Sequence, residues 1–171
     1  NNREELYCLG ELVHNKQVVD KLNDKGLVII DSLDAVPNDS ELIIRAHGVP
    51  ESVYLEALKR NIKIYDLTCP NVLKIHDKAK KLDVEGYFII LIAQKTHPEA
   101  IGTISFCGEN SVICENEEDL NSIIDYVKKN SFRKVAIISQ TTFSVLKFND
   151  FVKSFQDGLR DIELLVDNTI C

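Results

Sequence analysis

The sequence contains no apolar run long enough to cross a membrane, and it shows no secretion signal. A spanning helix needs about 20 apolar residues, and the first residues, 1–5, are polar and charged instead. Its 20 basic and 27 acidic residues give a formal net charge of −7. This charge argues against non-specific binding to nucleic acid or to anionic membranes. We therefore expect a cytoplasmic protein that binds no membrane and, in this portion, no nucleic acid.

Closely spaced cysteines are absent too. The five cysteines are odd in number, far apart and never arranged as CxxC: Cys8, Cys69, Cys107, Cys114 and Cys171. This spacing argues against a disulfide framework and against a structural zinc site, whose ligands usually come in close pairs. The chain also lacks the GxGxxG, Walker, HExxH and Ser-His-Asp patterns, so the common nucleotide-binding and hydrolase motifs are not indicated.

What the sequence does contain is a regular alternation of short β-branched apolar runs and amphipathic stretches. We expect strands at 5–9, 27–31, 41–46, 62–66, 87–92, 111–114, 134–138 and 162–166. We expect helices at 15–26, 50–60, 70–84, 98–107, 116–130 and 144–159. Strand–helix alternation predicts right-handed βαβ units and parallel sheets. The predicted fold is α/β, with two similar small domains at 1–67 and 68–168 that have mainly parallel sheets flanked by helices.

Reactive side chains follow the ends of several expected strands. The residues in question are His47, Cys69, His97, Glu99, Gln140, Thr141, Thr142 and Cys171. Parallel sheets bind ligands beyond the carboxyl ends of their strands, so this placement predicts one site assembled from several loops. The amide and hydroxyls at 140–142 can either cap the next helix or orient a hydroxylated or phosphorylated ligand.

Cys69 is the strongest single candidate, because it stands between an expected strand and a helix that starts at Pro70. A helix N-terminus favours the thiolate, which is the form that binds metal or acts as a nucleophile. The alternative role of a cysteine is that of a small buried hydrophobe. We favour that role for Cys8, Cys107 and Cys114, which lie within or beside apolar segments.

Histidines occur repeatedly at the same kind of position. His97 and Glu99 share one expected helix start, where an imidazole and a carboxylate can converge on a point and exchange protons. Taken singly, each histidine is read as a surface or capping residue. The recurrence of His14, His47 and His97 at strand-to-helix junctions favours a functional role. His76 lies in the middle of an expected helix and is interpreted as structural.

Several short segments together resemble the 4-hydroxy-3-methylbut-2-enyl diphosphate reductase family, iron–sulfur enzymes of the non-mevalonate isoprenoid pathway. The segments are Gly-Glu-Leu-Val-His-Asn at 10–15, Ala-His-Gly-Val at 46–49, Asp-Leu-Thr-Cys-Pro at 66–70, Lys-Ile-His at 74–76, His-Pro-Glu-Ala-Ile-Gly-Thr at 97–103, Ser-Gln-Thr-Thr at 139–142 and Asn-Thr-Ile-Cys at 168–171. Their order and spacing match the family throughout the chain. The match departs from the family at Ala93 and Gln94, where many members have Gly-His.

The resemblance implies a [4Fe–4S] cluster held by three cysteine thiolates, with one iron open to substrate. Cys69 and Cys171 match the second and third ligands, and the segment with the first ligand is absent from these residues. The family also has a third domain that contributes diphosphate contacts, of which residues 169–171 form the start. The resemblance therefore implies three domains around a central site, and we expect the 171 residues alone to be inactive.

By the same resemblance, His14, His47 and His97 contact the substrate, while Glu99 and Thr141 form a proton relay; Gln140 and Thr142 lie near the substrate. The implied reaction is reductive dehydroxylation of an allylic diphosphate to isopentenyl and dimethylallyl diphosphate, with electrons from ferredoxin or flavodoxin. The residues alone leave an alternative open, which is a cluster-free α/β module that binds a small phosphorylated ligand.

Overall fold

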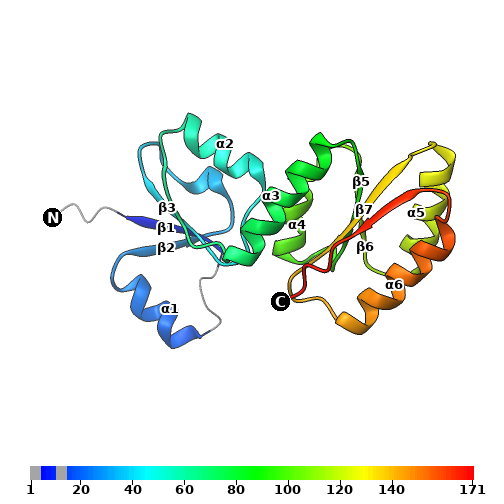
Figure 1. The fold of residues 1–171 in the computed structure, drawn as a ribbon. Coiled ribbons are helices and arrows are strands. Elements are labelled where there is room, and N and C mark those ends of the chain that lie inside the picture. The colour runs from blue at the N-terminus through cyan, green and yellow to red at the C-terminus, as the bar shows by residue number, and fades with distance from the viewer. Residues whose placement is uncertain (1–4, 11–14) are drawn as a thin grey trace. The chain divides into compact units, whose positions relative to one another are not determined.

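The structure is a computed structural model that describes residues 5–10 and 15–171 (Figure 1). The chain divides into two compact units, residues 1–69 and 70–171. Each unit contains one four-stranded sheet in which all neighbouring strands are parallel. The predicted α/β fold with two parallel sheets flanked by helices is therefore confirmed.

The first unit has the strand order β2-β1-β3-β4. Its elements are β1 (Leu6–Leu9), α1 (Lys16–Asn23), β2 (Leu27–Ile30), the 3-10 helix η1 (Leu33–Ala35), β3 (Glu41–Ile44), α2 (Glu51–Lys59) and β4 (Lys63–Asp66). The core forms where Leu42 of the central strand β3 packs among Tyr7, Val36 and Ala57. Leu42 and Ala57 have no exposed surface, so this small unit has a hydrophobic core of its own.

The second unit has the order β6-β5-β7-β8. Its elements are α3 (Pro70–Val84), β5 (Phe88–Ile92), α4 (Pro98–Ile104), β6 (Ser111–Cys114), α5 (Glu117–Lys129), β7 (Lys134–Ser139), α6 (Val145–Gly158) and β8 (Glu163–Val166). Every residue of β5 is buried, as expected for a parallel strand covered on both faces. Phe148 and Phe155 of α6 pack with α5 on one face of the sheet, while α3 and α4 cover the other (Figure 1).

The order of the strands creates a natural binding position in each unit. From β5 the chain passes through α4 to the outer strand β6, and α5 then returns it across the sheet to β7 on the other side of β5. The connections after the neighbouring strands β5 and β7 therefore leave on opposite faces of the sheet. Such a reversal opens a crevice at the carboxyl ends of the two strands. The same arrangement recurs at β1 and β3 in the first unit.

The expected strands and helices are all present, and their ends differ by at most three residues. The expected helix 98–107 ends at Ile104, where the Ser105 hydroxyl donates to the Gly102 carbonyl at 2.7 Å. Gly108 then turns the chain with a φ of +69°. The helix η1 was not predicted; it forms because Ser32 caps a short turn. In the part of the chain that the structure describes, no helix combines the length and apolar character of a transmembrane span.

The residues interpreted as packing residues are indeed buried. Cys8, Cys107 and Cys114 have no exposed surface. Burial raises the pKa of the Cys8 thiol above its ordinary value and raises the pKa values of Cys107 and Cys114 to about 12. His76 is buried as well, and its ring stacks on Phe106 with centroids 4.2 Å apart. These observations confirm the structural roles expected for the four residues.

Candidate active site

A buried carboxylate lies at the strand-order reversal of the second unit. Glu99, in the first turn of α4, is 1% exposed. One of its oxygens, Oε1, accepts the main-chain N–H of Thr141 at 2.6 Å, and Oε2 accepts the Thr141 hydroxyl at 2.8 Å. Thr141 follows β7, whereas Glu99 follows β5. The two residues that we expected to form a proton relay are therefore in direct contact.

His97 forms the N-cap of α4. Its Nδ1 accepts the main-chain N–H of Glu99 at 3.1 Å, and Pro98 occupies the first helical position. A nitrogen that accepts a hydrogen bond carries no proton, so the proton of the neutral ring is on Nε2. The capping role and the functional role of His97 are thus compatible, because each uses a different ring nitrogen.

Gln140 joins the two loops that carry Glu99 and Thr141. Its Oε1 accepts the main-chain N–H of Gln94 at 3.1 Å, and its Nε2 donates to the hydroxyl of Thr142 at 2.8 Å. Gln140 is buried, with 3% of its surface exposed. The polar atoms of Gln140 therefore hold the loops after β5 and β7 together.

Residues 167–171 continue alongside β7 after β8 has ended. The main-chain N–H of Asp167 donates to the Ile137 carbonyl at 2.9 Å, and that of Cys171 donates to the Thr141 carbonyl at 2.9 Å. Between these two bonds, the Thr169 hydroxyl accepts the N–H of Ser139 at 2.8 Å and donates to the Ser139 carbonyl. A threonine side chain thus takes the place of a main-chain pairing and keeps the segment parallel to β7.

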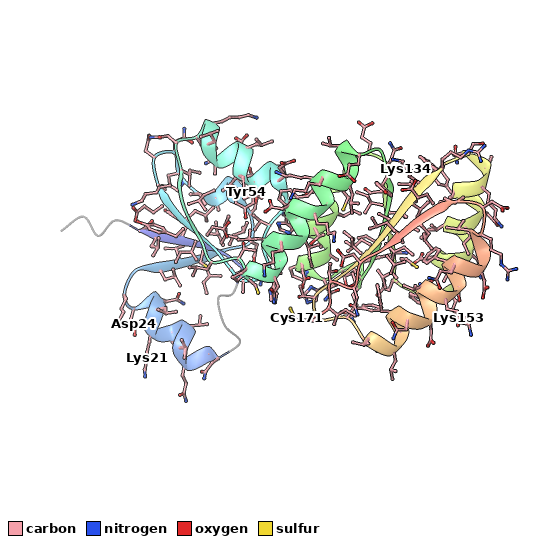
Figure 2. The ribbon with its side chains drawn as sticks, viewed as in Figure 1. Lys21, Asp24, Tyr54, Lys134, Lys153 and Cys171 are labelled. Atoms are coloured by element: carbon pink, nitrogen blue, oxygen red, sulfur yellow. The ribbon has the colours of Figure 1, made fainter. Side chains whose placement is uncertain are left out.

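Cys171 is the last residue of the chain, and its side chain is labelled in Figure 2. It is exposed and lines a cleft of about 290 Å³ between the beginning of α3 and residues 167–171. The amide Nδ2 of Asn71 donates to the Cys171 sulfur at 2.9 Å. Lys78 of α3 forms an ion pair with Asp167 and holds the other end of this segment. The thiol is therefore accessible yet fixed by its neighbours.

Sequence reasoning did not single out Asn71 or Thr169 as individual contributors. Thr169 had a signal, because it lies within the Asn-Thr-Ile-Cys segment that carries the family resemblance. Asn71 had none, since its contact joins residues 100 positions apart.

The first unit contributes His47 and Cys69. His47 is half-buried after β3, and Gly48 follows it with a φ of +73°. Cys69 is half-buried after β4, and its main-chain N–H donates to the Ala46 carbonyl at 2.9 Å. This bond places Cys69 next to the residue that precedes His47. Because α3 begins at the following residue, Pro70, the thiol has the predicted position before a helix.

A carboxylate orients the segment that carries Cys69. Oδ1 of Asp66 accepts the N–H of Thr68 at 2.9 Å, and Oδ2 accepts the hydroxyl of Tyr54 at 2.9 Å. Tyr54 belongs to α2 and is labelled in Figure 2. Burial, aided by the hydrogen bond and charge of Asp66, raises the pKa of Tyr54 to about 12, so its hydroxyl remains a donor. The turn before the candidate ligand is therefore braced from α2. His14, the remaining candidate, lies outside the described residues.

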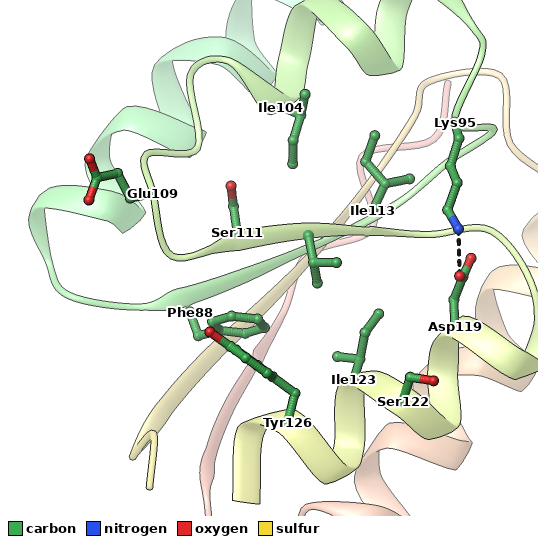
Figure 3. A pocket seen from close by; sticks show the side chains of 11 residues that line it. Phe88, Lys95, Ile104, Glu109, Ser111, Ile113, Asp119, Ser122, Ile123 and Tyr126 are labelled. Atoms are coloured by element: carbon green, nitrogen blue, oxygen red, sulfur yellow. Dashed lines mark hydrogen bonds and ion pairs between the residues drawn. The ribbon is translucent and has the colours of Figure 1, made fainter. Parts of the chain in front are cut away.

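A separate cavity of about 640 Å³ lies beside the outer strand β6 and is partly lined by its residues (Figure 3). Its apolar wall includes Phe88 and Tyr126, whose ring centroids are 5.7 Å apart, and an ion pair between Lys95 and Asp119 stands at one side. None of the candidate site residues lines this cavity. This cavity is therefore separate from the buried pair of Glu99 and Thr141.

Comparison with known proteins decides the family. The sequence matches the LytB protein family over residues 1–171. The chain belongs to the LytB family. A 4-hydroxy-3-methylbut-2-enyl diphosphate reductase of Clostridioides difficile is 36% identical over 170 residues, which is 99% of this chain and 59% of that protein.

Two solved structures resemble this LytB family member along its whole length. One is an (E)-4-hydroxy-3-methyl-but-2-enyl diphosphate reductase, with a TM-score of 0.82, 30% identity and coverage of 100% of this chain and 59% of the other. The second is the reductase from Plasmodium falciparum, with a TM-score of 0.85, 30% identity and coverage of 99% and 52%. The chain spans between 25% and 59% of the length of the curated relatives that it matches.

Two thiols of this LytB chain have positions that suit ligands of the iron–sulfur cluster that the family implies. Cys69 and Cys171 follow strand ends and are at least partly accessible, whereas the other three cysteines are buried inside the units. The Cys171 sulfur already accepts an N–H donor, as a cluster thiolate does. These two residues therefore fit as cluster ligands. Within residues 5–10 and 15–171, no three His, Cys, Asp or Glu side chains gather as a metal site.

Proposed function

We propose that this chain is part of an enzyme that reduces 4-hydroxy-3-methylbut-2-enyl diphosphate to isopentenyl and dimethylallyl diphosphate. The reaction consumes two electrons and two protons and releases the hydroxyl group as water. The observation that carries the proposal is the buried Glu99 carboxylate, which both donors of Thr141 hold at the carboxyl ends of β5 and β7. A reaction that expels water from an alcohol needs a proton donor at such a position.

In this proposal Thr141 stands between Glu99 and the substrate hydroxyl. The Thr141 side chain donates to Oε2, and the lone pairs of its oxygen can accept a hydrogen bond from the substrate hydroxyl. Proton delivery reverses both bonds: the Glu99 carboxyl, once protonated, donates to the Thr141 oxygen, and the Thr141 hydroxyl passes its own proton to the leaving oxygen. Because Glu99 is 1% exposed, the pair is shielded from bulk water.

Histidines contact the substrate in this proposal, and His14 and His47 do so mainly at the diphosphate. His97 keeps its Nδ1 on the Glu99 main chain, which directs the Nε2–H donor away from α4 and toward a substrate oxygen. His47 and His14 serve the same purpose from the first unit, since imidazoles bind phosphate oxygens without a strongly basic surface. Gln140 supports the loops on which His97 and Thr141 lie, and Thr142 completes its amide contacts.

Cys69 and Cys171 would hold a [4Fe–4S] cluster, with a third thiolate from outside these residues. When bound, such a cluster would supply electrons, delivered by a ferredoxin or flavodoxin, and Lewis acidity toward the alcohol oxygen. Cys171 lies opposite Thr141, and its main-chain N–H donates to the Thr141 carbonyl. This bond keeps the proposed cluster ligand next to the proposed proton relay.

The proposal is tested in the full-length protein after anaerobic reconstitution with iron and sulfide. We expect the absorption and electron paramagnetic resonance of a [4Fe–4S] cluster in the wild type. Glu99→Gln keeps the shape of the side chain and should retain the cluster, but turnover should fall by about 10²-fold or more. The control is Glu109→Gln, which removes an exposed carboxylate from the same unit and should leave turnover unchanged.

A reconstituted protein without a cluster would refute the proposal and favour the cluster-free phosphate-binding module. Full turnover by Glu99→Gln would refute the role of Glu99 while leaving the reductase itself in place. The two results are therefore distinguishable in a single set of proteins.

A further inference from the structure

One polar contact in the second unit is directed at a candidate cluster ligand. Asn71, the second residue of α3, donates its Nδ2 hydrogen to the sulfur of Cys171 at 2.9 Å. Both residues line the same cleft of about 290 Å³. The contact therefore combines a short distance with a shared cavity wall.

The direction of this hydrogen bond sets Cys171 apart from the buried cysteines. The thiols of Cys8, Cys107 and Cys114 act as donors to main-chain carbonyls at 3.3, 3.4 and 3.8 Å. A thiol that donates keeps its proton. The sulfur of Cys171 instead accepts the amide hydrogen of Asn71.

Both partners of the contact are held by the main chain. Asn71 lies in the first turn of a 15-residue helix, so its backbone is fixed. Cys171 is fixed through its N–H to the Thr141 carbonyl, and the preceding N–H, of Ile170, donates to the Asn168 side chain at 3.1 Å. Forming the bond therefore requires little additional ordering of either residue.

An N–H donor that points at a cluster thiolate withdraws charge from the sulfur. Reduction places one more electron on the cluster and increases the negative charge on its sulfur ligands. The same hydrogen bond is therefore stronger in the reduced state, and it raises the reduction potential.

We infer that Asn71 is a positioning residue for the Cys171 ligand, and that its amide raises the reduction potential of the cluster. This inference rests on the proposed function, because the cluster is part of that proposal. It adds a role for a residue that neither touches substrate nor binds iron.

The test measures the reduction potential of the reconstituted full-length protein by spectroelectrochemistry. Asn71→Leu removes the donor with little change in size, and it should shift the one-electron equilibrium roughly fivefold, or about 40 mV, to a lower potential. Asn71→Asp replaces the donor by a carboxylate facing the thiolate and should lower the potential further. Asn121→Leu, at an exposed asparagine of α5, is the matched control and should leave the potential unchanged.

The measurement does not depend on turnover. Unchanged potentials for Asn71→Leu and Asn71→Asp in proteins that contain their clusters would overturn the inference and leave the proposed function in place. A wild-type protein that binds no cluster would overturn the proposed function and, with it, the inference.

Discussion

Replacing Thr141 by valine tests the energetic importance of the buried pair with Glu99. The change keeps the shape of the side chain and removes the hydroxyl that donates to Oε2 at 2.8 Å. The main-chain bond to Oε1 remains. Leaving a buried acceptor without its donor costs about 1–3 kcal/mol. Because Glu99 is 1% exposed, water cannot replace the lost donor, and we expect the second unit to lose about 2 kcal/mol.

The assay uses cysteines that report on each unit separately. Cys114 is buried in the second unit and Cys8 in the first, so each becomes alkylated only when its own unit unfolds. A urea series with a short alkylation pulse then gives two midpoints in one experiment. With a urea dependence of about 2 kcal/mol per molar, Thr141→Val should lower the Cys114 midpoint by about 1 M. The Cys8 midpoint should not change.

Thr142→Val provides the matched control for this prediction. Thr142 is exposed, and its hydroxyl accepts from the Gln140 amide, whereas the Thr141 hydroxyl donates to a buried carboxylate. Its loss should cost under about 1 kcal/mol, because water can replace part of the contact. Equal midpoints for the two variants would refute the argument that burial makes the Glu99 contact strong. A double-mutant cycle with Glu99→Gln should give a coupling energy of at least about 1 kcal/mol.

The remaining predictions concern thiol reactivity and two turns. At pH 8 iodoacetamide should label Cys69 and Cys171 in the native protein, while the three buried thiols react only in urea; rapid native labelling of those three would contradict their burial. Their raised pKa values also imply that stability, fully present below about pH 9, falls as the pH rises toward 12, because the unfolded thiols ionise first. Gly108→Ala should destabilise the second unit by about 1–3 kcal/mol in urea unfolding, because its φ is +69° and a Cβ would meet Asp83 Oδ1 at 2.0 Å; wild-type stability would contradict this. Asn116→Ala removes the cap of α5 and should cost about 1 kcal/mol.

The sequence was sufficient to predict the elements and the position of the candidate residues after the carboxyl ends of the strands. Buried parallel strands such as β5 are nearly continuous apolar runs, and each is followed by a cap or a proline that marks the next helix. His97 and Glu99 were assigned to a helix start on this basis, and the structure places them there. These features depend on neighbours in sequence, which is why they can be read from it.

The contacts within the site could not be derived in the same way. Which oxygen of Glu99 meets which donor of Thr141 depends on how two loops 42 residues apart approach each other. The engagement of the Gln140 amide with Gln94 depends on the same approach. Composition and periodicity constrain which face of a helix or strand is buried and where the element ends. They do not determine how side chains from different loops meet across a sheet.

The Thr169 hydroxyl has a consequence for the length of the segment that carries Cys171. Asp167, Thr169 and Cys171 face Ile137, Ser139 and Thr141 in alternate, evenly spaced steps. One residue inserted or deleted there would move the thiol by roughly 3.3 Å along the segment and turn it toward the opposite side. A change in the length of the segment would therefore displace the thiol even if every side chain in it were kept.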